Sequence, residues 1–264
     1  MMIRSRLARV VFGAVVVAIA AFLLLPTIII FPISFSAASD ASQFPPATYS
    51  LKWYESVLTD PAWQSATITS FKTSCLTVIF SVVLGTSAAL ALFRSHFAGK
   101  AAVQALLLSP LVTPVIVLAI GIFMVFSSWR LVGTLVGLVA ANTVLSTPFV
   151  VASVTATLHT LNPNLEFASA GLGAGPWRTF WRVTLPLIFP GVMAGAIFAF
   201  IASWDEVVVA IFLTTPSLRT LPVLIWSGVR GEISPAVAAV GSILIMISAI
   251  GMVAVHLITK GESR

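Results

Sequence analysis

The chain has 264 residues, of which 59% are hydrophobic and only 8% are charged, and its mean hydropathy is +1.08. An average soluble domain has about a quarter charged residues, so a water-soluble fold is excluded and membrane lipid must solvate much of the surface. The formal net charge of +6 comes from basic residues scattered singly along the chain. No basic stripe of the kind that binds nucleic acid is present, so nucleic acid is not an expected partner.

The first predicted element is an uncleaved membrane helix. Arg4, Arg6 and Arg9 precede an apolar run that extends from Val10 to about Ile33. The apolar region of a cleavable signal peptide has only about 7–15 residues, whereas a membrane-spanning helix needs about 20. The run is therefore predicted to be the first membrane span.

Six apolar segments follow one another along the chain, and each is long enough for a tilted membrane helix. The apolar runs are continuous, which indicates helices, because the strands of a membrane barrel alternate in polarity. The sequence thus predicts an all-α integral membrane protein with a single transmembrane domain over residues 1–264. The predicted spans are residues 10–35, 62–93, 101–129, 131–158, 183–213 and 235–258.

The distribution of basic residues predicts the orientation of these spans. With the N-terminus inside, nine Lys and Arg residues lie in cytoplasmic segments and four lie on the opposite side. We therefore expect a multi-pass protein of the bacterial inner (cytoplasmic) membrane with both termini in the cytoplasm. The inner residues are Arg4, Arg6, Arg9, Arg94, Lys100, Arg178, Arg182, Lys260 and Arg264, and the outer ones are Lys52, Arg130, Arg219 and Arg230.

The outer loop over residues 36–61 is polar and contains the aromatic residues Trp53 and Tyr54. These rings are expected either in the headgroup belt of the membrane or in contact with a periplasmic partner or a passing substrate. Farther along the chain, two glycine pairs have GxxxG spacing, which lets membrane helices approach closely. The pairs lie in residues 133–137 and 191–195, and they predict close packing only.

A polar, glycine-bearing loop separates the fourth and fifth spans. Asn162 is a good N-cap and Pro163 suits the first helical position, so a short helix is predicted over residues 163–172, ended by Gly173 and Gly175. A helix of about ten residues is marginal alone in water and must lie against its own bundle or a separate protein. Its predicted apolar-to-small face, with Glu166 at the edge, consists of Leu165, Phe167, Ala168 and Leu172.

Asp205 and Glu206 are the only acidic residues inside a predicted span, and Trp204 precedes them. A carboxylate within the membrane is costly and indicates a functional site. Adjacent helical residues point roughly 100° apart, so the two acids cannot both face one pore. Either one binds cationic cargo while the other pairs with a neighbouring helix or Lys72, or both are structural and bind backbone donors or a partner subunit. Trp204 offers a cation–π face for an ammonium group.

The loop between spans four and five resembles the cytoplasmic signature of ABC importer permeases. In that signature, Glu-Ala-Ala is followed after three residues by Gly and after nine more by Ile-x-Leu-Pro. The departure is Phe167 at the position of the Glu, with an acid one residue earlier at Glu166, which leaves open which side chain contacts the ATPase. The corresponding residues here are Phe167, Ala168, Ser169, Gly173, Val183, Thr184, Leu185 and Pro186.

Within this superfamily, the sequence is similar to the second permease subunit of spermidine/putrescine importers. The residues that carry this resemblance are Trp204-Asp205-Glu206-Val207-Val208, Thr220-Leu221-Pro222 and Ile233-Ser234-Pro235. Related permeases serve opines, aminobutyrate or aminophosphonate, so these cargoes are the alternatives to a polyamine.

The resemblance implies the type I ABC importer permease fold, with six transmembrane helices and a short cytoplasmic coupling helix. It implies a homologous second permease subunit, two copies of a cytoplasmic ATPase that hold ATP and Mg, and a periplasmic or extracellular solute-binding protein. The chain itself then needs no cofactor. The implied coupling residues are Glu166, Phe167, Ala168, Ser169 and Gly173, and the expected substrate-path residues are Trp204, Asp205 and Glu206.

Two rival functions fit the residues less well. A membrane-embedded enzyme would need a nucleophile with its base or a set of metal ligands, but Cys75 and the three histidines are scattered, and no GxxxxGK[ST] phosphate loop is present. No catalytic or metal-binding residue is therefore predicted. A channel or secondary transporter working without ATP would explain the two acids but would leave the cytoplasmic helix without a purpose.

Overall fold

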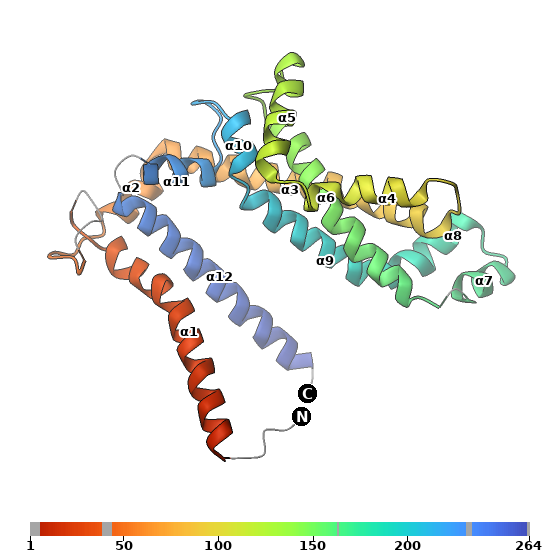
Figure 1. The fold of residues 1–264 in the computed structure, drawn as a ribbon, viewed down its shortest axis with the longest axis horizontal. Coiled ribbons are helices and arrows are strands. Elements are labelled where there is room, and N and C mark those ends of the chain that lie inside the picture. Colours follow the sequence, from red (N-terminus) through yellow and green to blue (C-terminus); the bar gives the residue numbers. More distant parts are fainter. Residues whose placement is uncertain (1–5, 39–43, 163, 231–233, 263–264) are drawn as a thin grey trace. The chain divides into compact units, whose positions relative to one another are not determined.

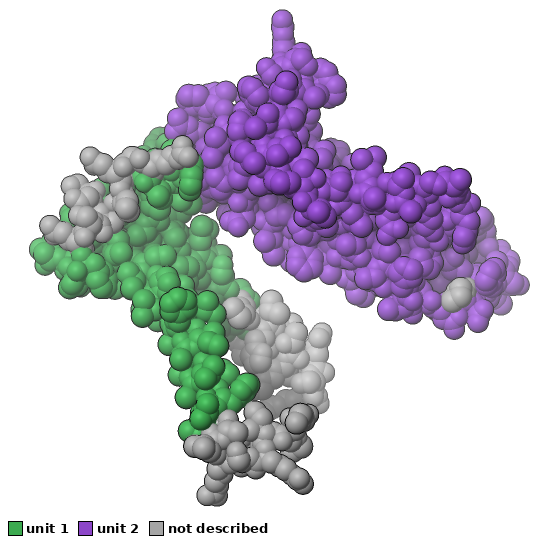
Figure 2. Space-filling view, viewed as in Figure 1, with its two compact units in different colours: residues 1–64, 225–264 green, residues 65–224 purple. Residues whose placement is uncertain are grey.

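The computed structural model describes residues 6–38, 44–162, 164–230 and 234–262. These residues are mostly helical, and their only β-structure is two isolated bridges (Figure 1). The all-α prediction is thus confirmed. The chain divides into two compact units, residues 1–64 with 225–264 and residues 65–224 (Figure 2). The boundaries fall within α3 (Pro61–Arg94) and α11 (Leu221–Arg230), and the single domain stays a prediction.

The first unit is built on two long apolar helices, α1 (Arg6–Ser34) and α12 (Pro235–Glu262), which lie side by side (Figure 1). The short helix α2 (Lys52–Thr59) packs against α12. The Tyr54 hydroxyl lies 2.7 Å from the Ser34 hydroxyl and 2.7 Å from that of Ser242. Neither interpretation of the loop aromatics anticipated this role, in which Tyr54 connects the loop over residues 36–61 to both long helices.

The core of the second unit lies between α6 (Leu135–Thr160) and α9 (Leu185–Trp204), which pack along each other. Small residues permit this approach: a Cβ on Gly195 would lie 2.9 Å from the Val150 Cα atom of α6. On the α3 side, a Cβ on Gly85 would lie 2.7 Å from the Val150 Cβ atom. Val150 is fully buried between these two glycines.

The two GxxxG segments are both closely packed, but in different ways. Residues 191–195 provide the predicted close approach, because a Cβ on Gly191 would meet the Thr157 hydroxyl of α6. Residues 133–137 are closely packed as well, because a Cβ on Gly133 would lie 2.9 Å from the Thr215 Cγ2 atom and one on Gly137 would meet the Leu131 carbonyl, but the contact is not one between two long helices. Gly133 has a φ of +76° and lies in a turn before α6, where Thr134 caps the helix by accepting a hydrogen bond from the Gly137 N–H group. This cap also explains why α6 begins at Leu135 and not at residue 131.

The third predicted span, residues 101–129, is not one straight helix. It consists of α4 (Lys100–Leu108), a short 3-10 turn (Ser109–Leu111) and α5 (Val115–Ser128), and the two parts are bent by 101°. Pro114 lacks an N–H donor and disfavours the helical conformation of the residue before it, so the helix cannot continue through this point. The sequence analysis predicted a single span over these residues. Helix α5 packs against α10 (Val208–Leu213).

The fifth predicted span, residues 183–213, differs at both ends. It begins earlier, with α8 (Pro176–Thr179) and the π-helical turn η2 (Phe180–Thr184), and α9 then ends at Trp204 before the separate helix α10. Within the described residues, four helices are long and apolar enough to cross a membrane, or five if the bent pair counts as one span. The apolar part of α12 found there, Pro235–Gly251, is shorter. The count of six spans stays a prediction.

Candidate coupling and substrate-path sites

The helix predicted between spans four and five is present as α7 (Asn164–Gly171). The Asn162 Oδ1 atom accepts a hydrogen bond from the Asn164 N–H group at 3.0 Å, as expected of an N-cap. Pro163, the predicted first helical residue, lies outside the described residues. At the other end, Gly173 has a φ of +81°, and its N–H group donates to the Ala170 carbonyl at 2.9 Å. This left-handed glycine ends the helix as predicted.

Glu166 of α7 turns toward its own bundle. Its Oε1 atom accepts hydrogen bonds from Arg94 Nη2 at 2.6 Å and from Thr184 Oγ1 at 2.6 Å. Arg94 ends α3, and the buried Thr184 ends the π-helical turn η2. We call Arg94, Glu166 and Thr184 the α7 clamp, because they join α7 to two other elements of the second unit.

The other two clamp residues also affect the ionisation of Glu166. Partial burial raises the pKa of Glu166, but the hydrogen bonds from Thr184 and Arg94 and the charge of Arg94 outweigh that effect and hold the pKa below its usual value. The carboxylate is therefore stabilised in its charged form. A π-helical turn is rare and frequently marks a functional site, and here it supplies one of the three clamp residues.

Several apolar residues of α7 and Leu172, the residue that follows it, are exposed. Phe167 is 74% exposed and Leu172 is 89% exposed, and Leu165 and Ala168 are exposed as well. Of the other predicted coupling residues, Ser169 lies 3.0 Å from the Thr179 hydroxyl of α8, and Gly173 ends the helix. Exposed large apolar side chains in a short segment between predicted spans suit a contact with another protein. Among the predicted coupling residues, Glu166 and Ser169 thus contact other elements of their own unit, whereas Phe167 and Ala168 are exposed.

The predicted substrate-path residues lie at the break between α9 and α10. Trp204 is the last residue of α9, and its ring stacks on Phe200 with centroids 5.8 Å apart. The Glu206 carboxylate accepts hydrogen bonds from the Val209 N–H at 2.7 Å and the Ala210 N–H at 2.8 Å, so it caps α10. Asp205, by contrast, is exposed.

These contacts show that the two acids have different environments. The structural alternative, binding to backbone donors, describes Glu206, whereas Asp205 is exposed. Lys72, the suggested ion partner, is exposed on α3. The sequence signal for the break was an acidic residue at the start of a new helix, but the surrounding apolar run obscured it.

A row of buried hydroxyl groups on α3 was not predicted from the sequence. The residues recur at helical spacing on one buried face, and Ser70 Oγ accepts a hydrogen bond from the Leu221 N–H group at 2.7 Å. Among the described residues, several of these hydroxyls have no hydrogen-bond partner. Their period in the sequence could have revealed this polar face. The buried hydroxyl residues are Thr69, Ser70, Thr73, Ser74, Thr77, Ser81 and Thr86.

The described part of the chain contains no group of three or more His, Cys, Asp or Glu side chains close enough to hold a metal ion.

Comparison with known proteins agrees with this arrangement. Residues 81–264 match the family described as "Binding-protein-dependent transport system inner membrane component". The chain is 30% identical over 259 residues to the spermidine/putrescine transport system permease protein PotC of Escherichia coli (strain K12), covering 97% of this chain and 96% of that protein. It is 28% identical over 251 residues to the putrescine transport system permease protein PotI of the same strain, covering 92% and 89%.

The fold is similar to that of a solved bacterial ABC transporter involved in the import of the acidic polysaccharide alginate. The TM-score is 0.74 at 19% identity, and the match covers 99% of both chains. The helical architecture, the family match and the full-length relatives lead to one conclusion. The chain belongs to the family of binding-protein-dependent inner-membrane transport components, and it is a permease subunit of an ABC importer, a transport component and not an enzyme.

Proposed function

We propose that the chain forms half of the translocation path for a small cationic solute of the polyamine class, such as spermidine or putrescine. The observation that carries this proposal is the exposed Asp205 carboxylate at a helix break within a predicted membrane span. An ammonium group needs an oxygen acceptor, and a carboxylate supplies one with opposite charge. Trp204 precedes it and offers an aromatic face. The similarity to PotC and PotI over nearly the whole chain supports the same cargo class.

The proposed motor is a separate ATPase that docks on the exposed apolar side of α7. Phe167 and Leu172 supply the docking surface, and the α7 clamp connects that surface to α3 and η2. When two ATPase copies close on ATP, they favour one of two conformations of the permease pair, and α7 transmits the movement through the clamp. ATP and Mg belong to the ATPase subunits.

The proposed assembly has a homologous second permease subunit, the two ATPase copies and a solute-binding protein outside the membrane. In this arrangement the chain has six spans, with both termini in the cytoplasm. The exposed residues Trp177 and Trp181 alternate with Arg178 and Arg182 just before α9. Tryptophan and arginine in one short segment suit the headgroup level of the inner leaflet, which supports this orientation.

The cargo is tested by uptake of labelled putrescine into proteoliposomes that contain the complete transporter and its solute-binding protein. Asp205→Asn should reduce uptake at limiting solute by roughly tenfold or more, because a hydrogen bond to a charged group contributes about 1.5–3 kcal/mol. The matched control is Glu55→Gln, which neutralises an exposed acid on α2. Unchanged uptake by Asp205→Asn would contradict its role, and a solute-binding protein that prefers an opine, aminobutyrate or aminophosphonate would contradict the polyamine assignment.

The docking surface is tested by co-purification of the ATPase with the permease. Phe167→Ser should release the ATPase, whereas Phe97→Ser should retain it, because Phe97 is also exposed, at 47%, but lies outside α7. A permease that binds the ATPase equally well in both variants would refute docking on α7. Charge reversal at Glu166 combined with Gly173→Gln should abolish uptake without preventing membrane insertion.

A further inference from the structure

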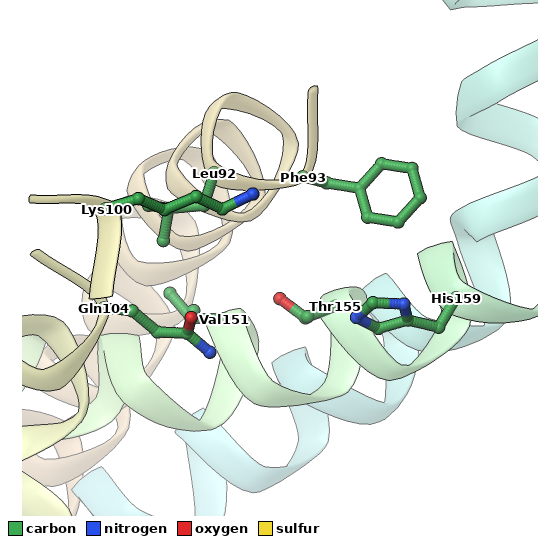
Figure 3. Close-up of a pocket in the computed structure, with 7 residues that line it drawn as sticks. All are labelled: Leu92, Phe93, Lys100, Gln104, Val151, Thr155 and His159. Carbon is green, nitrogen blue, oxygen red and sulfur yellow. The ribbon is translucent and has the colours of Figure 1, made fainter. Parts of the chain in front are cut away.

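A second cavity lies near the α7 clamp but is lined by different polar residues. It opens between α3, α4 and α6 and has a volume of about 240 Å³ (Figure 3). The clamp borders a smaller cavity of about 100 Å³ that contains Arg94, Glu166 and Thr184. The larger cavity is lined by Leu92, Phe93, Lys100, Gln104, Val151, Thr155 and His159.

The polar groups of this cavity suit an anion. The Lys100 ammonium, the Gln104 amide, the Thr155 hydroxyl and the His159 imidazole can all donate hydrogen bonds, and none of the seven lining residues is acidic. Figure 3 shows Lys100 on one side of the opening and Gln104, Thr155 and His159 on the other. Lys100 Nζ donates one hydrogen bond to the Ser95 carbonyl at 3.1 Å, and an ammonium group has three N–H donors. The other N–H donors of Lys100 can therefore bind a ligand.

The apolar part of the lining indicates that this anion has a hydrophobic attachment. Leu92, Phe93 and Val151 form that part, and the Phe93 ring meets the His159 ring edge-on at 5.3 Å. The cavity also lies where three predicted spans end, at residues 93, 101 and 158. In the predicted arrangement of the spans, a site at these ends lies between the hydrocarbon of the membrane and its headgroup layer.

We propose that this cavity binds the phosphate headgroup of an acidic phospholipid, with Lys100 as the cationic anchor and His159, Thr155 and Gln104 as neutral donors. Basic pockets between transmembrane helices on the cytoplasmic side suit such headgroups. A free phosphate or nucleotide shares the anion chemistry but has no acyl chain for the apolar wall. The site goes beyond solute transport; only its assignment to the inner leaflet rests on the orientation proposed above.

Occupancy of the site would affect the clamp. Phe93, which lines the cavity, immediately precedes Arg94 of the clamp in α3. A bound headgroup would hold the end of α3 against α4 and α6, and thereby hold Arg94 in place for Glu166. Acidic lipid would then act as a positive regulator of the connection between α7 and the bundle.

The test is lipid binding to the full chain in zwitterionic detergent, measured by native mass spectrometry. The probes are phosphatidylglycerol and phosphatidylcholine with identical acyl chains. The wild-type chain should prefer phosphatidylglycerol by about tenfold, and Lys100→Gln/His159→Gln should lose that preference, since one basic residue near an acidic lipid contributes roughly fivefold and the second donor adds to it. Lys72→Gln/His96→Gln makes the same chemical change at exposed positions outside the cavity and should have no effect.

Several outcomes would overturn the proposal. Equal binding of the two lipids by the wild-type chain would exclude an acidic headgroup site without requiring any variant to fold. Retained preference in Lys100→Gln/His159→Gln would exclude this cavity, and Lys100→Arg should keep the preference because it keeps the charge. Displacement of the lipid by glycerol 3-phosphate at equal concentration would identify a soluble anion as the ligand. An error in the proposed orientation or cargo leaves these detergent measurements unchanged.

Discussion

Removal of the Glu166 carboxylate should release α7 from the rest of its unit. The side chains of Arg94 and Glu166 are 47% and 40% exposed, so solvent screens their ion pair and its contribution is about 0.2–1 kcal/mol. The hydroxyl of the buried Thr184 loses its carboxylate acceptor as well, which costs about 1–3 kcal/mol. For Glu166→Ala we expect about 2 kcal/mol in total, or roughly a 30-fold larger population of detached α7.

Hydrogen exchange of the α7 amides in the purified full chain measures this population. The amides of residues 167–171 should exchange roughly 30 times faster in Glu166→Ala than in the wild type. Glu166→Gln should have a smaller effect, because its amide oxygen still accepts a hydrogen bond from Thr184. Glu55→Gln, which alters an exposed acid on α2, serves as the control and should leave these amides unchanged.

The pH dependence provides an independent check. The pKa of Glu166 is lowered in the folded state from its ordinary value of 4.5. The stabilisation is therefore fully present above pH 4.5 and is lost as the pH falls through the folded-state pKa. The difference between the wild type and Glu166→Gln should shrink over that acidic range. Equal α7 exchange in the wild type and Glu166→Ala at neutral pH would refute the clamp.

Three further changes should alter stability in predictable ways. Gly191→Ala should lower the Tm of the detergent-solubilised chain by several degrees, because the new Cβ meets α6 and overpacking costs about 1–3 kcal/mol. Gly121→Ala is the control and should not lower the Tm, because a Cβ at that position faces open space. Glu206→Ala removes the cap of α10 and should destabilise the chain by about 1–2 kcal/mol in the same thermal assay, with a smaller loss for Glu206→Gln. Gly173→Ala places a Cβ on a residue with a left-handed backbone conformation, so it should raise the exchange rate of the α7 amides by about fivefold or more. Gly171→Ala should not raise it, because a Cβ at that position would meet no atom within 4 Å.

The sequence was informative where one strong local signal acts alone. The limits of α3 were predicted to within one residue from the apolar run, and the ends of α7 followed from Asn162 and Gly173, whose side-chain cap and left-handed backbone are local properties. Hydropathy could not reveal the 101° bend before α5, because the segments on both sides of Pro114 are apolar and together resemble one span.

The candidate site required three-dimensional information. The contact of Glu166 with Arg94 joins residues 72 positions apart, and no local pattern specifies which side of a short amphipathic helix meets its own bundle. In the same way, two adjacent acids look alike in sequence. Only the start of α10 at Val208 shows that Glu206 binds backbone donors while Asp205 stays exposed.

Val150, held between Gly85 of α3 and Gly195 of α9, has a consequence for how these helices can evolve. The atoms of Val150 that lie nearest the two glycines are its Cα and Cβ, which every residue except glycine keeps on substitution at position 150. Gly195→Ala should therefore be rejected even together with Val150→Ala, because the new Cβ would still lie 2.9 Å from the Cα atom of residue 150. We expect glycine to persist at both positions in functional sequences, whichever small apolar residue stands between them.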